Sequence, residues 1–327
     1  MKPLLSVVIP LFNAEKEIEI CLNSLFQSSW PYFEVIIVDD CSTDRSLAIA
    51  GQYPCRIFTM DTNKGPAAAR NLGVNKAESD IILFLDSDTM VRRDSFKQFY
   101  DAFLENPGID AVLAVPDMAS LRSCRASNYN SLRSHFTFIS AEPISDFFST
   151  QMGAMRKEAF YAAGGFNEIY TGADIEDIEL GMRLPPKRVL IHKDIIIRHH
   201  FPSFGSILKK YLRRANQFSR LLRERKKLTS VHTNKKGMLS IISVLLSALF
   251  LLLTIMSVLL IASLGFVITL FFLLCYLISV VSFFKLNRRL FTFCANTKGS
   301  IYLVQAAFFE YVFSLAIGLG GILSWIY

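Results

Sequence analysis

Three acidic clusters lie in the first two thirds of the chain, and each is of a kind that takes part in metal-assisted or acid–base chemistry. Asp39-Asp40 and Asp86-Ser87-Asp88 each follow an apolar run, and Glu176-Asp177 opens a segment of helical period. Carboxylate oxygens are hard ligands that can share a divalent cation with phosphate oxygens. A placed carboxylate can also accept a proton from a hydroxyl group. These residues predict metal-assisted chemistry on a diphosphate.

Each aspartate pair also has a structural alternative. Asp86 and Asp88 could begin a turn or a helix, but they follow the apolar run 81–85 without a break, so we expect both at a strand end. Capping of the next helix is the alternative for Asp39 and Asp40. Capping does not explain two consecutive acids after a strand, and we expect one of them to accept hydrogen bonds from a base or ribose.

A further candidate segment runs from Lys64 to Asn71. Gly65 stands at a turn and Pro66 can begin a helix, which leaves free backbone N–H groups at the positive end of the helix dipole. Arg70 follows one turn inside that helix. An ordinary Gly-Pro turn with a surface arginine is the alternative, and this segment alone favours it.

Alternating strands and helices must position these residues. Short apolar runs alternate with segments of helical period along residues 1–117, which is typical of β-α-β units. The predicted strands are Leu5–Ile9, Glu34–Val38, Arg56–Met60, Ile81–Leu85 and Ala111–Val115. Helices are predicted over 15–26 and from near Asp44, Pro66 and Asp94.

The ends of three predicted strands carry the candidate residues. Pro10 and Asn13 follow the first strand, Asp39-Asp40 the second and Asp86-Ser87-Asp88 the fourth. In open α/β sheets, ligands bind beyond the carboxyl ends of the strands. We therefore expect these side chains to converge on one crevice.

The motifs together resemble family 2 glycosyltransferases of the GT-A fold, over roughly residues 4–205. Ser6–Asn13, the Asp39-Asp40 pair, Lys64–Asn71 and Asp86-Ser87-Asp88 come in that family's order and approximate spacing. The resemblance implies an α/β nucleotide-diphospho-sugar transferase fold, Rossmann-like, with a mostly parallel central sheet. It implies a UDP- or GDP-linked sugar donor and a divalent metal, Mg²⁺ or Mn²⁺. The residues that would bind the nucleotide sugar are Pro10, Asn13, Asp39, Asp40, Lys64, Gly65, Arg70, Asp86 and Asp88.

The resemblance continues into an acceptor half. Gly153–Phe160 and Gly164–Glu168 resemble the segment before the family's catalytic helix, with Asn167 where an Asp is more usual. Glu176–Arg183 resembles the helix itself. Asp177 would then be the catalytic base, with Gly153, Glu176 and Arg183 as further motif residues; an acidic helix start is the alternative.

A histidine pair follows the apolar run 195–197. It resembles the position at which related enzymes bring a histidine to the metal or diphosphate, and we expect His199, rather than His200, to join Asp86 and Asp88 as a ligand. The alternative is that the two histidines only cover part of the protein surface and bind no ligand. The Gln-x-x-Arg-Trp signature of processive synthases is missing after it, so a single transfer is expected.

The last third of the chain is apolar enough to enter a membrane. Residues 239–284 carry no charge, and one crossing needs about 20 apolar residues. We predict spans over 239–261, 264–284 and 301–325, the first two joined near 262–265. The third contains Glu310, for which helix packing is favoured over a transport role.

Charge is divided unevenly along the chain. Residues 1–208 hold 20 basic and 26 acidic side chains, whereas Lys209–Lys236 holds eleven Lys or Arg and only one acid. An acidic globular part makes nucleic acid a poor partner. Basic residues beside a span either attract anionic lipid or only set orientation. We expect an integral protein of the cell membrane with its catalytic part in the cytoplasm.

The predicted organisation has three parts. A GT-A domain over 1–208 has a nucleotide-sugar half (1–117) and an acceptor half (118–208); a basic amphipathic segment (209–237) and a transmembrane region (238–327) follow. Lys2 precedes an apolar run too short for a signal, so a first strand is expected. The six cysteines lack zinc-like spacing, and no disulfide framework is implied.

These observations predict a membrane-bound, inverting glycosyltransferase of cell-envelope glycan or glycolipid synthesis. The expected acceptor is a hydroxyl of a lipid or lipid-linked glycan. A polyprenyl-phosphate sugar synthase is the alternative, although its anionic acceptor oxygen would need no base such as Asp177. A non-catalytic nucleotide-sugar-binding membrane module is a second alternative.

Overall fold

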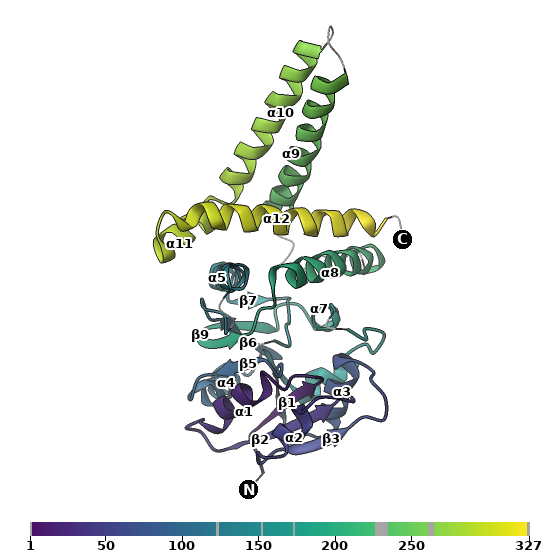
Figure 1. Cartoon of the computed structure of the whole chain (residues 1–327). Helices are drawn as coiled ribbons and strands as arrows, with labels where there is room; N and C mark the ends of the chain where they lie inside the picture. Colours follow the sequence, from purple (N-terminus) through teal and green to yellow (C-terminus); the bar gives the residue numbers. More distant parts are fainter. Residues whose placement is uncertain are drawn as a thin grey trace. The chain divides into compact units, whose positions relative to one another are not determined.

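The structure is a computed structural model that describes residues 2–121, 124–151, 153–172, 174–225, 235–260 and 265–325 (Figure 1). It divides into two compact units, which are considered separately. The described residues up to Ser203 form the N-terminal unit, and those from Phe204 onward form the C-terminal unit.

The N-terminal unit is an α/β structure. Its strands are β1 (Leu5–Leu11), β2 (Phe33–Asp39), β3 (Arg56–Thr59), β4 (Ile81–Phe84), β5 (Thr89–Val91), β6 (Ala111–Pro116), β7 (Ile144–Ser145), β8 (Gly153–Arg156) and β9 (Val189–His199). Its helices are α1 (Ile18–Phe26), α2 (Ser46–Ala50), α3 (Pro66–Lys76), α4 (Ser95–Glu105), α5 (Arg125–Ser140), α6 (Lys157–Ala162) and α7 (Glu176–Arg183). All five predicted strands are present.

One sheet with the order β3-β2-β1-β4-β8-β6-β9-β5 organises this unit, and β7 pairs with β9. The strands β3, β2, β1 and β4 are parallel, as the alternation of strands and helices predicts. The short strand β8 then runs antiparallel between β4 and β6. β8 has the sequence Gly-Ala-Met-Arg, which is not an apolar run, and so it was not predicted. With β8, the sheet contains antiparallel as well as parallel pairs.

Buried aliphatic side chains hold helix α3 against the centre of the sheet. Val7, Val8 and Ile9 of β1 are fully buried, as β-branched residues in a central strand should be. Gly73 of α3 lies so close to the sheet that an added Cβ would stand 2.4 Å from Val8 Cγ1. This close packing fixes the start of α3 at the carboxyl ends of the strands.

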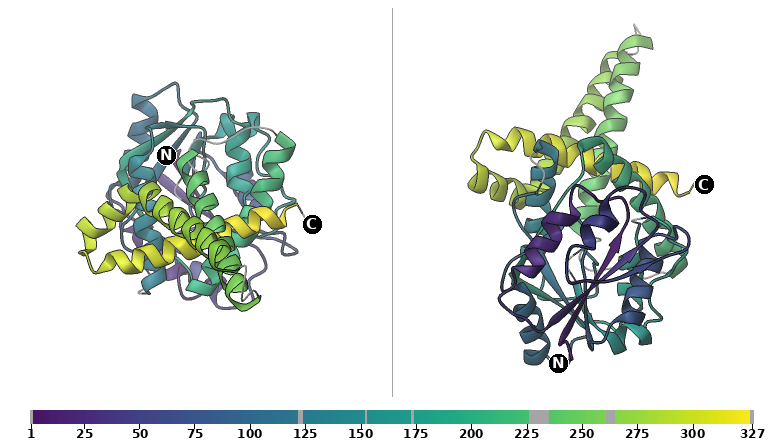
Figure 2. Two further views of the ribbon diagram at one scale, coloured as in Figure 1. Left: turned by 90° about the horizontal axis from the view of Figure 1, so that it is seen from above. Right: turned by 60° about the horizontal axis from the view of Figure 1, so that its bottom comes forward.

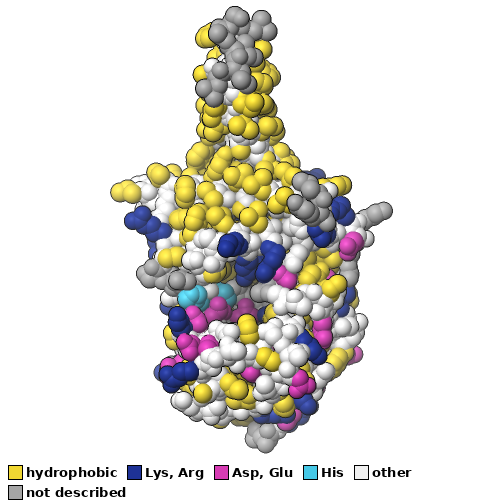
Figure 3. All heavy atoms as spheres, turned by 45° about the vertical axis from the view of Figure 1, so that its right-hand side comes forward, with side chains coloured by type: hydrophobic (Ala, Val, Ile, Leu, Met, Phe, Trp, Pro, Cys, Tyr) yellow, Lys and Arg dark blue, Asp and Glu magenta, His cyan; other side chains and the backbone are white. Residues whose placement is uncertain are grey.

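The C-terminal unit is helical. It contains α8 (Phe204–Arg225), α9 (Lys235–Leu260), α10 (Gly265–Leu286), α11 (Arg288–Lys298) and α12 (Tyr302–Leu323). The helices α9, α10 and α12 are long and apolar enough to cross a membrane. The apolar side chains of α9 and α10 cover most of the stalk in Figure 3. The predicted turn near 262–265 lies almost entirely outside the described residues.

Candidate active site

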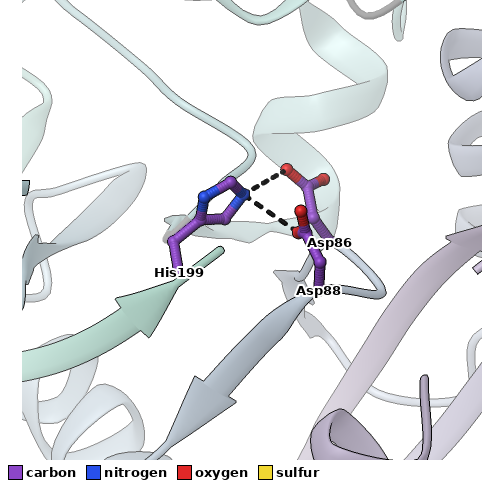
Figure 4. A group of neighbouring side chains, drawn as sticks. All are labelled: Asp86, Asp88 and His199. Carbon is purple, nitrogen blue, oxygen red and sulfur yellow. Dashed lines mark ion pairs between the residues drawn. The ribbon is translucent and has the colours of Figure 1, made fainter. Parts of the chain in front are cut away.

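Two aspartates and a histidine meet at the ends of three strands. Asp86 and Asp88 lie between β4 and β5, and β5 pairs antiparallel with β9 so that Thr89 stands opposite His199. His199 Nε2 lies 2.9 Å from Asp88 Oδ1 and 3.7 Å from Asp86 Oδ2 (Figure 4). His200 contributes only its backbone N–H, which donates to the carbonyl of Asp88. The pairing of β5 with β9 therefore brings His199, rather than His200, to the two aspartates.

The charges of this cluster perturb one another strongly. Burial alone would lower the pKa of His199, but the charges of Asp88 and Asp86 raise it to about 9. Burial alone would raise the pKa of Asp86, but the contacts with His199 and Arg70 hold it well below its ordinary value. The two carboxylates that draw a proton to His199 would equally attract a metal cation, which the ring would bind in its neutral form.

The donor set of this cluster fits a divalent cation. One ligand atom from each of Asp86, Asp88 and His199 lies within 4.8 Å of the others. His199 Nδ1 is buried and makes no hydrogen bond with another residue in the described part of the chain, whereas the buried Asp88 Oδ1 has His199 Nε2 beside it at 2.9 Å. A buried nitrogen without a partner is costly unless a ligand or water meets it. Two carboxylates with one imidazole suit Mg²⁺ or Mn²⁺.

Arg70 joins the aspartate pair to the first turn of α7. Its side chain is 4% exposed, and Nη2 donates to Asp86 Oδ1 at 2.8 Å while Nη1 donates to Glu176 Oε1 at 2.9 Å. Burial would lower the pKa of Arg70, but the two acids raise it above its ordinary value. The expected alternative, a surface arginine, does not hold. One planar guanidinium fixes two acidic motifs that are 90 residues apart in sequence.

Asp177 follows Glu176 in the first turn of α7. It is 6% exposed, and its Oδ1 accepts a hydrogen bond from the N–H of Ile178 at 2.9 Å. Glu176 accepts from the N–H of Asp174 as well as from Arg70. Asp177 therefore lies beside a side chain that the Arg70 network holds in place.

Asp40 organises the loop that precedes α3. Its two carboxylate oxygens accept from the N–H groups of Lys64 and Gly65, both at 2.8 Å. Gly65 has φ +89°, and an added Cβ would stand 2.2 Å from the carbonyl oxygen of Thr171. Only glycine fits there without displacing the backbone. The Lys64 side chain is exposed, so the loop presents a basic group beside a helix N-terminus.

The other predicted residues at the ends of β1 and β2 make hydrogen bonds within loops or lie at the strand edge. Asn13 has φ +46°, and its Oδ1 accepts from the N–H of Thr43 at 2.8 Å. Asp39 is buried and accepts from the N–H of Ser42 at 3.3 Å. β4 pairs with β1 only as far as Val8, so Pro10 lies beyond the part of β1 that has neighbours on both sides.

Two of the predicted motif residues make packing and loop contacts. An added Cβ at Gly153 would stand 2.3 Å from the carbonyl oxygen of Ser149, so β8 needs glycine there. Arg183 donates to Glu179 and to the carbonyl oxygens of Ala163 and Gly165. Arg183 thereby ties α7 to the glycine turn before it.

Sequence reasoning did not single out Asn71 within its segment. Its Nδ2 donates to the carbonyl of Phe166 at 3.0 Å and to Glu168 at 2.8 Å, and its Oδ1 accepts from the N–H of Phe166. Asn71 follows Arg70 directly, so α3 bonds both α7 and the 166–168 segment. The available signal was its place directly after Arg70, within the segment 64–71 that resembles the family pattern.

The comparisons with known proteins agree with this geometry. Residues 6–164 match the model of the family described as glycosyl transferase family 2. The N-terminal unit carries a family 2 glycosyltransferase domain. The domain's fold is also that of a mannosyltransferase, PcManGT from Pyrobaculum calidifontis, solved with GDP-Man and Mn²⁺. That structure aligns with a TM-score of 0.58 and 17% identity over 99% of this chain and 88% of its own, which shows likeness of fold.

Curated relatives match the chain over shorter lengths. An uncharacterized glycosyltransferase of Haemophilus influenzae is 38% identical over 109 residues, which is 32% of this chain and 44% of that protein. The poly(ribitol-phosphate) beta-N-acetylglucosaminyltransferase TarS of Staphylococcus aureus is 37% identical over 115 residues, 33% of this chain and 20% of TarS. The chain thus spans less than half the length of these relatives.

Proposed function

We propose that this chain is a membrane-bound glycosyltransferase that moves a sugar from a UDP- or GDP-linked donor to a hydroxyl of a lipid or lipid-linked glycan, with inversion and in single transfers. The observation that carries the proposal is the ion-pair chain from Glu176 through Arg70 to Asp86. It joins the Asp86–Asp88 motif, which is proposed to bind the diphosphate, to the Glu176–Asp177 motif, which is proposed to accept the proton.

Asp86, Asp88 and His199 are the residues that would hold a divalent metal. When bound, such a metal neutralises the charge that grows on the departing nucleoside diphosphate. PcManGT was solved in complex with GDP-Man and Mn²⁺, which supports this choice of ion. Arg70 keeps Asp86 in its ligand orientation, and Asp40 holds the Lys64–Gly65 loop at a helix N-terminus suited to phosphate oxygens.

Asp177 acts as the base in this proposal. It takes the proton from the acceptor hydroxyl while that oxygen forms a bond to the anomeric carbon and the carbon's bond to the diphosphate breaks. A placed base contributes about 10²- to 10⁴-fold. One base and one leaving-group site suffice for a single displacement, which inverts the anomeric carbon.

The apolar helices support a membrane-associated acceptor. α9 and α10 present exposed leucine, isoleucine and phenylalanine side chains along their lengths. A relative named for poly(ribitol-phosphate) supports a role in cell-envelope polymer synthesis. A hydroxyl acceptor is favoured over a polyprenyl phosphate. The attacking oxygen of a phosphate is already anionic and carries no proton for Asp177 to remove.

The test combines a donor screen with product analysis. Purified full-length chain in lipid is incubated with Mn²⁺ and radiolabelled UDP- and GDP-sugars, using extracted envelope lipids or polyprenyl phosphate as acceptors, and products are separated by thin-layer chromatography. We expect alkali-stable lipid or glycan products that Asp177→Asn abolishes. Products formed only on polyprenyl phosphate would show that the acceptor is a phosphate and not a hydroxyl. Donor hydrolysis without any transfer would refute the proposal.

A further inference from the structure

The apolar helix α12 lies alongside the basic helix α8 over nearly its whole length. Phe204 at the start of α8 packs on Phe309 with ring centroids 5.6 Å apart, and Arg223 near its end donates to Ser324 at 2.8 Å. Between these points an added Cβ at Gly320 would stand 2.4 Å from the carbonyl oxygen of Leu212. The two helices therefore run in the same direction with their backbones in close contact.

Helix α12 crosses α9 steeply. The hydroxyl of Tyr311 lies 2.8 Å from Ser247 Oγ, and an added Cβ at Gly318 would stand 2.9 Å from Leu245 Cδ1. From Tyr311 to Gly318 the axis of α12 advances about 10 Å, whereas their contact residues Ser247 and Leu245 are only about 3 Å apart along the axis of α9. Two helices packed side by side would advance together. Figures 1 and 2 show α12 lying across the α9–α10 pair in every view. α12 therefore does not extend α9 and α10 into a three-helix bundle.

Helix α8 cannot lie in a hydrocarbon layer. Its basic side chains are Lys209, Lys210, Arg213, Arg214, Arg220, Arg223 and Arg225. From Lys209 to Arg223 the helix rises about 21 Å, which is most of the roughly 30 Å hydrocarbon core. Each Lys or Arg near the middle of a span costs about 2.5–3.5 kcal/mol. A helix packed lengthwise on α8 therefore shares its position at the membrane–water boundary.

The end of α12 is bound to α8 by one arginine. Arg223 donates to the carbonyl oxygen of Ser324 at 2.6 Å, and its guanidinium lies 4.5 Å from the ring centroid of Trp325. Arginine and tryptophan both favour the headgroup region. If α12 crossed the bilayer, Ser324 and Trp325 would stand on the opposite side from α8.

We infer that α8 and α12 form an in-plane platform seated in one leaflet of an anionic membrane, and that α9 and α10 are the two helices that cross it. Exposed basic residues of α8, such as Lys209 and Arg213, meet lipid headgroups, at about 1 kcal/mol per Lys or Arg. Exposed apolar side chains meet acyl chains; they include Ile301 at the N-cap of α12 and, within α12, Val304, Phe308, Leu319 and Ile322. Ser324 and Trp325 then lie on the side of the membrane where α8 lies, and α12 does not form the third span expected from hydropathy.

Topology reporters on the full chain test this inference independently of any transferase activity. Fluorescent protein or alkaline phosphatase is joined after the last residue, in Escherichia coli, and inserted between α9 and α10 as a control for the opposite side. We expect the C-terminal fluorescent protein to be bright and the C-terminal phosphatase inactive, with the reverse in the control. An active C-terminal phosphatase beside a dark fluorescent protein would overturn the inference.

Cross-linking in native membranes gives a second readout without a reporter. In a chain whose native cysteines are replaced by alanine, Arg223→Cys is paired with Trp325→Cys or, as a matched control, with Ile301→Cys at the other end of α12. We expect a short bismaleimide to link 223 to 325 only. A link to 301 without one to 325 contradicts the in-plane platform.

Discussion

Replacing Arg70 with methionine should destabilise the N-terminal unit by an amount set by burial rather than by the number of ion pairs. The substitution keeps most of the side-chain volume and removes the guanidinium between Asp86 and Glu176. Because Arg70 and Glu176 are each 4% exposed, the Glu176 carboxylate loses its counter-charge in a region with little water, whereas Asp86 is 30% exposed and loses less. Breaking a buried ion pair by removing one partner costs about 3–5 kcal/mol.

Arg56, in β3 of the same unit, provides a matched control. It also pairs with two carboxylates, Glu34 at 2.5 Å and Glu78 at 2.9 Å, but its side chain is 40% exposed. Exposed ion pairs contribute about 0.2–1 kcal/mol each. Arg56→Met should therefore cost about 2 kcal/mol or less, and clearly less than Arg70→Met.

Tryptophan fluorescence during urea unfolding can measure this difference. The chain has two tryptophans, so in a Trp325→Phe background Trp30, which is buried in the N-terminal unit, reports on that unit alone. Adding Asp86→Asn and Glu176→Gln to Arg70→Met should recover much of the lost free energy of unfolding, because no charge is then left unpaired. Equal losses for Arg70→Met and Arg56→Met, or no recovery in the triple variant, would refute the reasoning.

Three further substitutions have defined outcomes. Asp177→Asn should lower the transfer rate by about 10²-fold or more and leave nucleotide affinity within a few fold; turnover near the wild-type level removes Asp177 as the base. Gly65→Ala should cost about 1–3 kcal/mol of unfolding free energy because of its positive φ and the adjacent carbonyl, whereas Gly108→Ala, with nothing within 4 Å, should cost much less. His199→Ala should weaken Mn²⁺ binding by about 10-fold or more in calorimetry, while His200→Ala should not; equal effects contradict the ligand assignment.

Sequence patterns predicted β1, β2 and β4, whose ends carry candidate residues, because each short apolar run is bounded by polar or turn residues. The positions of Asp86 and Asp88 followed from the run 81–85 alone. The partner of these acids did not, because the approach of His199 depends on the antiparallel pairing of β5 with β9, which joins residues about 110 positions apart. Family resemblance supplied that residue where local spacing could not.

Arg70 and Arg183 show the limit of sequence reasoning from another side. Both were predicted as site residues, but nothing in one sequence tells a buried arginine between two acids from an exposed one. Arg70 connects two motifs, and Arg183 holds the turn at Gly165. Hydropathy does not tell whether an apolar helix crosses a membrane or lies in its plane. α12 is apolar enough to cross, and our inference that it lies in the plane rests on its packing on α8.

Nucleotide binding with and without metal tests the central claim most directly. Isothermal titration of UDP and GDP into the full-length wild-type chain and into Asp88→Ala is carried out in Mn²⁺ and again in excess chelator. We expect one nucleotide to bind the wild-type chain at least about 10-fold more tightly with Mn²⁺, and this gain to vanish in Asp88→Ala. The same metal-dependent gain in Asp88→Ala, or none in the wild-type chain, would show that the cluster of Asp86, Asp88 and His199 does not hold a metal for a diphosphate.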